Sequence, residues 1–236
     1  MILLRYAAPL LALTLLTSCQ IARSAFVDQT PQIAAIAIRD DVPDYQKFAT
    51  RHFTLAFIAP AYSGFGYFVE GAPIPWSQTR AEFLSALERA LATYEAVDLF
   101  LLAHSNSYLD WIAELDPNLR RHLRLVYNTG CGDAAQGQRW LDLGARAYVG
   151  HPGDNIAPLF DYFFLPEWTA GRRLEDAVAS ANARTREDLF DGAVGWMTEV
   201  TEDLDAPARY WQATRALVYG DGRITIDTPS SKARSP

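Results

Sequence analysis

The sequence has little cysteine and little excess positive charge. Its 236 residues include 2 Cys, and 21 Lys and Arg stand against 28 Asp and Glu, so the formal net charge is −7 at pH 7. Domains that bind nucleic acid usually carry a basic surface. We therefore expect no nucleic-acid partner for this chain.

Internal repeats and a complete nucleotide-binding loop are also missing. The fragment Gly64-Phe65-Gly66 lacks the third glycine and the helix start of a dinucleotide fingerprint, which argues against nucleotide binding. We expect neither a cofactor nor a metal in the chemistry of this chain. Apolar residues make up 50% of the sequence, and a chain of this length can bury one sizeable core.

The first long apolar run, Pro9–Leu16, is too short to span a membrane stably. It follows Arg5, and residues 1–18 read as an export signal. The four residues Leu-Thr-Ser-Cys that end at Cys19 resemble the bacterial lipobox, in which signal peptidase cuts before the cysteine and its thiol receives lipid. An ordinary secretory signal with a chance cysteine is the alternative.

Gln20, rather than Asp, follows the cysteine, and by the rule for Gram-negative lipoproteins this implies the outer membrane. The expected protein is anchored through lipid (palmitate among its acyl chains) on Cys19 in the bacterial cell envelope, facing the periplasm. The expected domain layout is a signal peptide (1–18), a tether (19–31), one α/β domain (32–227) and a disordered tail (228–236).

Three apolar runs separated by helical segments organise the middle of the chain. They are Val97–Ala103, Leu123–Asn128 and Ala145–Gly150. Mostly apolar runs of strand length that alternate with helices are typical of a parallel sheet built from βαβ units. We therefore predict an α/β fold, a three-layer sandwich with a mostly parallel sheet.

Other segments complete this prediction. Strands are expected at Ile33–Ile38 and Phe53–Ile58, and a strand, tight turn and strand at 216–226. The loop Tyr62–Trp76, rich in Gly, Pro and aromatics, reads as a hairpin or a mobile flap, and its aromatics are expected to cover part of the core, with the lining of a cleft as the alternative. Helices are expected to start at Thr79 with a capping box, at Ser107 and at Asp116-Pro117, and to cover Gln136–Leu143, Asp154–Leu165 and Arg172–Phe190.

Candidate chemistry lies where the strands end. Reaction sites of parallel sheets lie beyond the carboxyl ends of the strands, and His104, Cys131 and His151 fall there. If Cys19 is lipidated, Cys131 is a free thiol in an oxidising compartment, which suggests either chemistry or a buried, inert cysteine. A cysteine nucleophile needs a base or a positive neighbour, and histidine provides both near neutral pH.

The residues around Cys131 suit an acyl-transfer site. The backbone N–H groups of Cys131 and Ser105 are candidate donors to a developing oxyanion. Gly130 and Gly132 let the backbone turn tightly around the thiol. The pattern is not Gly-x-Cys-x-Gly, which disfavours a nucleophile elbow.

A strand ending in His, a helical crossover and a strand ending in a small residue and Cys resemble the caspase-like clan of cysteine peptidases. The similarity is greatest to CHAT domains and covers roughly residues 95–222. Its four motifs, in the order of that family, are Leu125–Cys131, Leu143–Gly150, Phe160–Ala181 and Tyr210–Asp221.

The resemblance implies a caspase-like fold and a cysteine endopeptidase that acts on a peptide or protein substrate. It implies Cys131 as nucleophile, His104 as general base or orienting group, and an oxyanion hole from the N–H groups of Cys131 and Ser105. The family usually has Gly where this chain has Ser105, and Ala where it has Gly130. The alternative is therefore an inactive caspase-like domain that binds a partner protein at the membrane.

Further residues could line the same cleft. His151 could be a second base, a specificity residue or an ordinary loop residue before Pro152. Asp133 and Asp154 could make the cleft acidic and favour a basic substrate side chain, although Asp154 could simply cap a helix. Small-molecule binding in this cleft is a further possibility.

Overall fold

The computed structural model describes residues 32–39, 44–69, 76–102, 107–153, 157–187, 211–212 and 214–229. All of these belong to one compact unit, Gln32–Pro236. The expected signal peptide, the tether up to Pro31 and Cys19 lie outside the described residues. Among the helices that the structure describes, none has the length and apolar character needed to cross a membrane.

A six-stranded sheet forms the centre of the domain, in the order β2-β1-β3-β4-β5-β6. The first five strands run parallel, and β6 pairs antiparallel with β5. This confirms the predicted α/β fold with a mostly parallel sheet. The strands are β1 (Ile33–Arg39), β2 (Gly64–Val69), β3 (Ala96–Leu102), β4 (Leu123–Asn128), β5 (Ala147–Gly150) and β6 (Leu217–Gly220).

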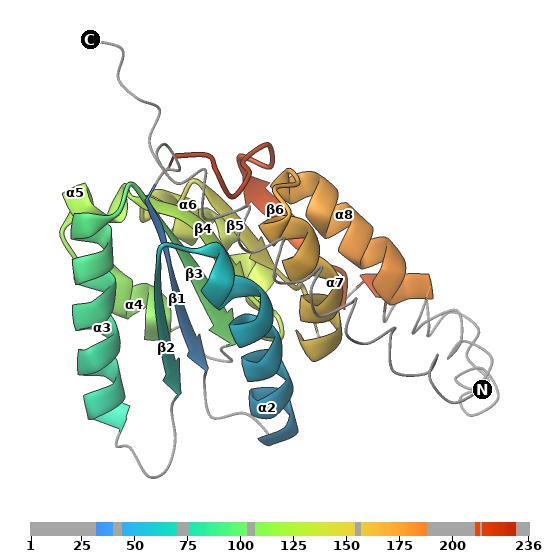
Figure 1. Cartoon of the computed structure of the whole chain (residues 1–236), viewed down its shortest axis with the longest axis horizontal. Coiled ribbons are helices and arrows are strands. Elements are labelled where there is room, and N and C mark those ends of the chain that lie inside the picture. Colours follow the sequence, from blue (N-terminus) through green and yellow to red (C-terminus); the bar gives the residue numbers. More distant parts are fainter. Residues whose placement is uncertain are drawn as a thin grey trace, which may run out of the picture. The chain divides into compact units, whose positions relative to one another are not determined.

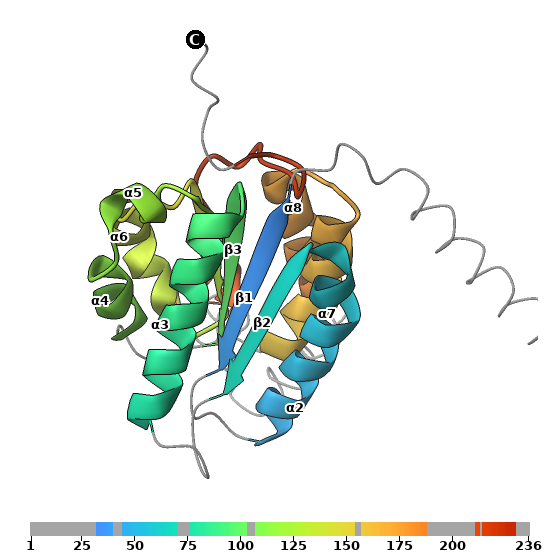
Figure 2. The same cartoon turned by 60° about the vertical axis from the view of Figure 1, so that its left-hand side comes forward.

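Helices cover both faces of the sheet, so that the domain has three layers (Figures 1 and 2). Strands β1, β3, β4 and β5 are buried along their whole length because both of their faces are covered. One face carries α3 (Trp76–Thr93), α4 (Ser107–Ala113), α5 (Pro117–Arg120) and α6 (Gly137–Asp142). The other face carries α2 (Asp44–Phe53), α7 (Ala157–Thr169) and α8 (Leu174–Thr185).

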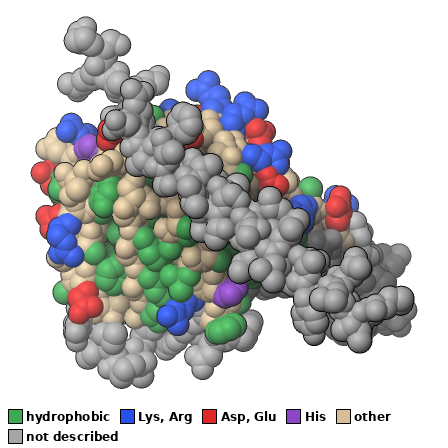
Figure 3. Space-filling model, in the orientation of Figure 1, with side chains coloured by type: hydrophobic (Ala, Val, Ile, Leu, Met, Phe, Trp, Pro, Cys, Tyr) green, Lys and Arg blue, Asp and Glu red, His purple; other side chains and the backbone are tan. Residues whose placement is uncertain are grey.

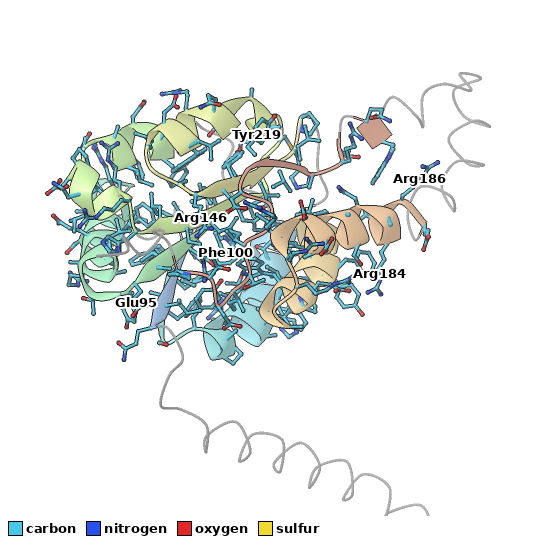
Figure 4. The ribbon with its side chains drawn as sticks, turned by 90° about the horizontal axis from the view of Figure 1, so that it is seen from above. Glu95, Phe100, Arg146, Arg184, Arg186 and Tyr219 are labelled. Atoms are coloured by element: carbon cyan, nitrogen blue, oxygen red, sulfur yellow. The ribbon has the colours of Figure 1, made fainter. Side chains whose placement is uncertain are left out.

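Side chains of each strand alternate between two apolar cores. Leu99 and Leu101 of β3 pack under α3 and α4, whereas Phe100 points to the α7 side. Seen from above, Phe100 lies in the interior of the described part, between the sheet and the α7 layer (Figure 4). The apolar runs read from the sequence are therefore strands sandwiched between helices.

The predicted strand at Phe53–Ile58 is wrong. Helix α2 continues into a single π-helical turn, Thr54–Ile58, and then into a 3-10 turn, Ala59–Ala61. Thr54 and Ile58 are both buried and lie four residues apart, which is the spacing of a helical face. A short apolar run suits either structure, and packing against α7 selects the helical one.

The interpretation of Tyr62–Trp76 as a hairpin or flap is wrong for residues 62–69, and residues 70–75 lie outside the described residues. Its described part holds β2, which pairs parallel with β1 from Gly64 to Val69. The expectation that its aromatics cover the core is confirmed. Phe65 and Tyr67 pack against the core on the α7 side, and Phe68 packs on the α3 side.

Of two helix starts predicted from capping residues, one is confirmed and one is wrong. Asp116 caps α5 by accepting a hydrogen bond from the Asn118 N–H at 2.8 Å, as predicted. The predicted capping box at Thr79 is wrong, because α3 begins at Trp76 and Thr79 lies inside it.

The predicted second strand at Arg223–Ile226 is wrong as well. Residues 221–229 form turns and irregular backbone rather than a strand, and β6 pairs with β5. The Arg146 side chain, just ahead of β5, binds the Asp221 carboxylate at 2.8 Å. Ile226 instead buries its side chain in the core on the α7 side.

Candidate functional site

The loop that follows β4 is tied to the neighbouring strand at its first residue. The Thr129 N–H donates to the Leu101 carbonyl at 2.9 Å, and the Thr129 hydroxyl donates to the same oxygen at 3.1 Å. Leu101 of β3 lies opposite Asn128 of β4 in the parallel ladder. The strands that precede His104 and Cys131 in the sequence are therefore neighbours that end at the same edge of the sheet.

Asn128 and Asp133 fix the path of this loop. The Asn128 side-chain carbonyl accepts from the Gly130 N–H at 3.0 Å, and its amide donates to the buried Asp133 carboxylate at 2.7 Å. Asp133 also accepts from the Gln136 side chain. These bonds fasten both ends of the segment that carries Cys131.

Cys131 is a free cysteine and is partly exposed. The next residue, Gly132, has φ +74°, a left-handed conformation that favours glycine. Its N–H donates to the Gly153 carbonyl at 3.0 Å. Among the hydrogen bonds between described residues, none uses the Cys131 thiol or its N–H. Within the described part of the chain, this loop therefore carries a free cysteine and a backbone N–H without a hydrogen bond.

His151, at the end of β5, supports this loop from inside the domain. It is 0% exposed, and its ring packs edge-on against Phe160 with centroids 5.0 Å apart. Its Nδ1 lies 2.6 Å from the Thr214 carbonyl, so this nitrogen carries the proton of the neutral ring. Its carbonyl accepts from the Ala134 N–H at 3.0 Å, two residues after Gly132.

Burial makes the imidazole of His151 a weak base. It lowers the pKa of His151 to about 4, while the hydrogen bond to the Thr214 carbonyl acts in the opposite direction. The Nε2 atom is buried and has no hydrogen-bond partner within the described part of the chain. His151 is therefore neutral at physiological pH and does not face solvent.

Other residues singled out by the sequence are not placed. His104, Ser105 and Asp154 lie outside the described residues. The groups that the structure brings together at this edge are Cys131, Gly130, Gly132, Asp133 and His151, all from the loops after β4 and β5.

A second cluster of polar side chains at this edge was not predicted from the sequence, because no motif marks it. The Tyr127 hydroxyl donates to the Asp161 carboxylate at 2.6 Å, and both residues are buried. Burial raises the pKa of Asp161 to about 6, although the Arg39 charge and the Tyr127 hydrogen bond oppose the shift. Arg39, at the end of β1, donates to the Phe100 carbonyl at 3.1 Å and to Thr54 Oγ1 at 2.5 Å. An arginine that ends a buried strand was the only sequence signal for this cluster.

A buried ion pair lies near the opposite ends of the strands. Arg124 holds the Asp98 carboxylate through two hydrogen bonds of 2.9 and 2.7 Å, and both side chains are wholly buried. The Tyr62 hydroxyl donates to Asp98 at 2.5 Å and accepts from the Trp168 indole at 2.9 Å. Burial, together with the Asp98 charge, raises the pKa of Tyr62. Every member has a partner, so this network is structural.

No trio of His, Cys, Asp or Glu side chains within the described ranges is arranged to hold a metal ion. No protein-family model matches the sequence, and no curated protein matches it either. The fold and the strand-end loop are therefore the basis on which a function is proposed.

Proposed function

We propose that this chain is a lipid-anchored cysteine peptidase of the bacterial envelope, with a caspase-like domain closest to CHAT domains. Cys131 is the nucleophile and His104 is its general base. The observation that carries the proposal is Cys131, a free and partly exposed cysteine on a hydrogen-bonded loop directly beyond β4.

The strand order supports pairing these two residues. A caspase-like site needs one strand that leads to the histidine and a neighbouring parallel strand that leads to the cysteine. Strands β3 and β4 are such neighbours, and α4 and α5 form the crossover between them. His104 follows the last residue of β3 by two positions and Cys131 follows the last residue of β4 by three.

The chemistry in this proposal is acyl transfer. The Cys131 thiol gives its proton to His104, and the sulfur attacks the peptide carbonyl carbon to form a C–S bond. The N–H groups of Cys131 and Ser105 donate to the oxyanion. His104 then gives the proton to the leaving amine as the C–N bond breaks, and water hydrolyses the thioester. No cofactor takes part.

The anchor belongs to the same proposal. Lipid on Cys19 holds the domain on the outer membrane, and the tether up to Pro31 gives it reach into the periplasm. The substrate is a peptide or protein in that compartment, and its sequence preference is open.

An inactive, protein-binding caspase-like domain is the second candidate. It is favoured by the burial of His151, the described histidine at the end of β5, because its buried ring is not open to a substrate. Ser105 and Gly130, which differ from the family pattern, point the same way.

Labelling with an iodoacetamide or acyloxymethyl ketone probe separates the two candidates. We expect the probe to attach to Cys131 of the folded protein, and Cys131→Ser to abolish labelling. His104→Ala is expected to slow labelling by roughly tenfold or more, because a general base contributes about 10²–10⁴ to such reactions. His122→Ala, at a partly exposed histidine that contacts the Glu95 carbonyl, is the matched control and is expected to label normally.

Equal labelling rates in His104→Ala and His122→Ala, or an unreactive Cys131 in the folded wild type, would argue for the binding module. Thermal melting of each variant shows whether a slow rate reflects chemistry or unfolding.

A further inference from the structure

Strand β2 forms an uncharged edge of the sheet. It pairs with β1 on one side, and no described strand pairs with its other side. The residues of β2 are Gly, Phe, Gly, Tyr, Phe and Val, all partly exposed. Edge strands usually carry Lys, Pro or a bulge that prevents pairing with another chain, and β2 carries no such residue. The opposite edge strand, β6, is only four residues long.

A groove flanks β2 on each face of the sheet. The groove on the α2 side has a volume of about 410 Å³ and is lined by Phe48, Arg51, Tyr67 and Val69. Phe48 is 75% exposed there. The groove on the α3 side has a volume of about 390 Å³ and is lined by Phe68, Ala81, Glu82, Ser85, Ala86 and Arg89.

The surface view shows hydrophobic side chains gathered between α3 and α2, where the ribbon views place β2 (Figures 1 to 3). A strand added to β2 would point alternate side chains to the two faces of the sheet, and so into the two grooves. The edge and its grooves therefore form one docking surface.

The sequence of β2 is complementary to a second copy of itself. In an antiparallel pair centred on Gly66, Phe65 lies opposite Tyr67 of the second copy and Gly64 lies opposite its Phe68. Aromatic pairs across strands stabilise a sheet, and an aromatic ring opposite a glycine covers exposed backbone. Gly66 opposite Gly66 leaves the centre of the pair free of side chains.

The charges on α3 are self-complementary in the same symmetry. Glu82 and Arg89 lie at the two ends of the groove, with Ser85 and Ala86 between them. A two-fold axis through β2 brings the second α3 alongside the first in the opposite direction. Glu82 then faces Arg89 of the second copy, and the small side chains allow the two helices to approach.

We propose that the chain forms a homodimer through antiparallel pairing of β2 with β2, which joins the two sheets into one. The axis passes through Gly66, the two α2 helices meet on one face and the two α3 helices meet on the other. The dimer contacts leave the loops after β4 and β5 outside the interface, so dimerisation and the proposed peptidase activity are independent.

Charge reversal on α3 tests the dimer without disturbing the fold, because Glu82 and Arg89 are exposed. Sedimentation equilibrium of the full-length chain in mild detergent is expected to show a concentration-dependent dimer. Glu82→Arg or Arg89→Glu places like charges opposite each other twice per dimer, and roughly a tenfold rise in the dimer Kd is expected. The double exchange restores the pairs and returns the Kd to within about threefold of wild type.

Val69→Lys adds a charge at the edge of β2 and is expected to give monomer. Ala113→Lys on α4, an exposed position away from β2, is the matched control and is expected to remain dimeric. Thermal melts confirm that each variant is folded. A wild-type chain that stays monomeric at high micromolar concentration, or a dimer that all of these variants leave unchanged, would overturn the proposal.

Discussion

Two buried titratable groups, His151 and Asp161, are expected to change stability in opposite directions as the pH falls. His151 has a pKa of about 4 in the folded chain against an ordinary value of 6.5. Between these values the unfolded chain binds a proton that the native chain does not. The free energy of unfolding therefore falls with falling pH from 6.5 to 4, by about 1.4 kcal/mol per pH unit.

Asp161 has the opposite effect. Its pKa is about 6 in the folded chain against an ordinary value of 3.8, because burial disfavours the charged carboxylate. Between these values the native chain binds a proton that the unfolded chain does not. The free energy of unfolding therefore rises with falling pH over this range, by the same slope of about 1.4 kcal/mol per unit. In the wild type the two effects nearly cancel between pH 6 and 4.

Removing one group at a time exposes the other. Asp161→Asn keeps an acceptor for the Tyr127 hydroxyl and removes the titration beside Arg39. Relative to wild type, this variant is expected to lose about 3 kcal/mol of unfolding free energy between pH 7 and pH 4. His151→Asn keeps a donor for the Thr214 carbonyl and is expected to gain about 3 kcal/mol over the same range.

Urea unfolding followed by tryptophan fluorescence at half-unit pH steps measures these differences. Subtracting the wild-type curve removes the contribution of all other carboxylates, which titrate alike in the three proteins. Slopes of the same sign in the two variants, or flat differences in both, would refute the reasoning from burial.

Two further predictions concern stability and the Cys131 loop. Asp98→Ala leaves the wholly buried Arg124 without its carboxylate, and we expect it to lower the free energy of unfolding in urea by about 3–5 kcal/mol. Glu114→Ala breaks an exposed ion pair with Arg80, and we expect it to lower the same free energy by less than about 1 kcal/mol. Equal costs would contradict the role given to burial. Asn128→Ala removes the acceptor of the Gly130 N–H, so we expect faster hydrogen exchange at this amide, measured by mass spectrometry. Unchanged exchange would show that Asn128 does not fix the loop.

The central strands were predictable because they are apolar runs of strand length. Strands β1, β3, β4 and β5 are apolar runs with helical segments between them, and a parallel sheet covered on both faces is the arrangement that buries such runs. The Asp116 cap was predictable for a local reason, since its carboxylate bonds to an N–H two residues away.

The wrong predictions concern segments whose local pattern suits two structures. Phe53–Ile58 is apolar in either a strand or a helix, and its contact with α7 decides for the helical turn. Residues 217–220 pair with β5 rather than with the residues that follow, because Arg146 binds Asp221 and Ile226 enters the core.

The candidate site also has one part that could be predicted from the sequence and one part that could not. By itself the sequence determined which strands are buried, that they run in parallel, and that Cys131 follows one of them, since these depend on composition and order along the chain. The tertiary structure alone decided that His151 is enclosed and neutral, that Asp133 locks the Cys131 loop, and that Asp161 is buried beside Arg39. Burial and charge pairing arise between segments far apart in the sequence, and no local pattern of residues encodes them.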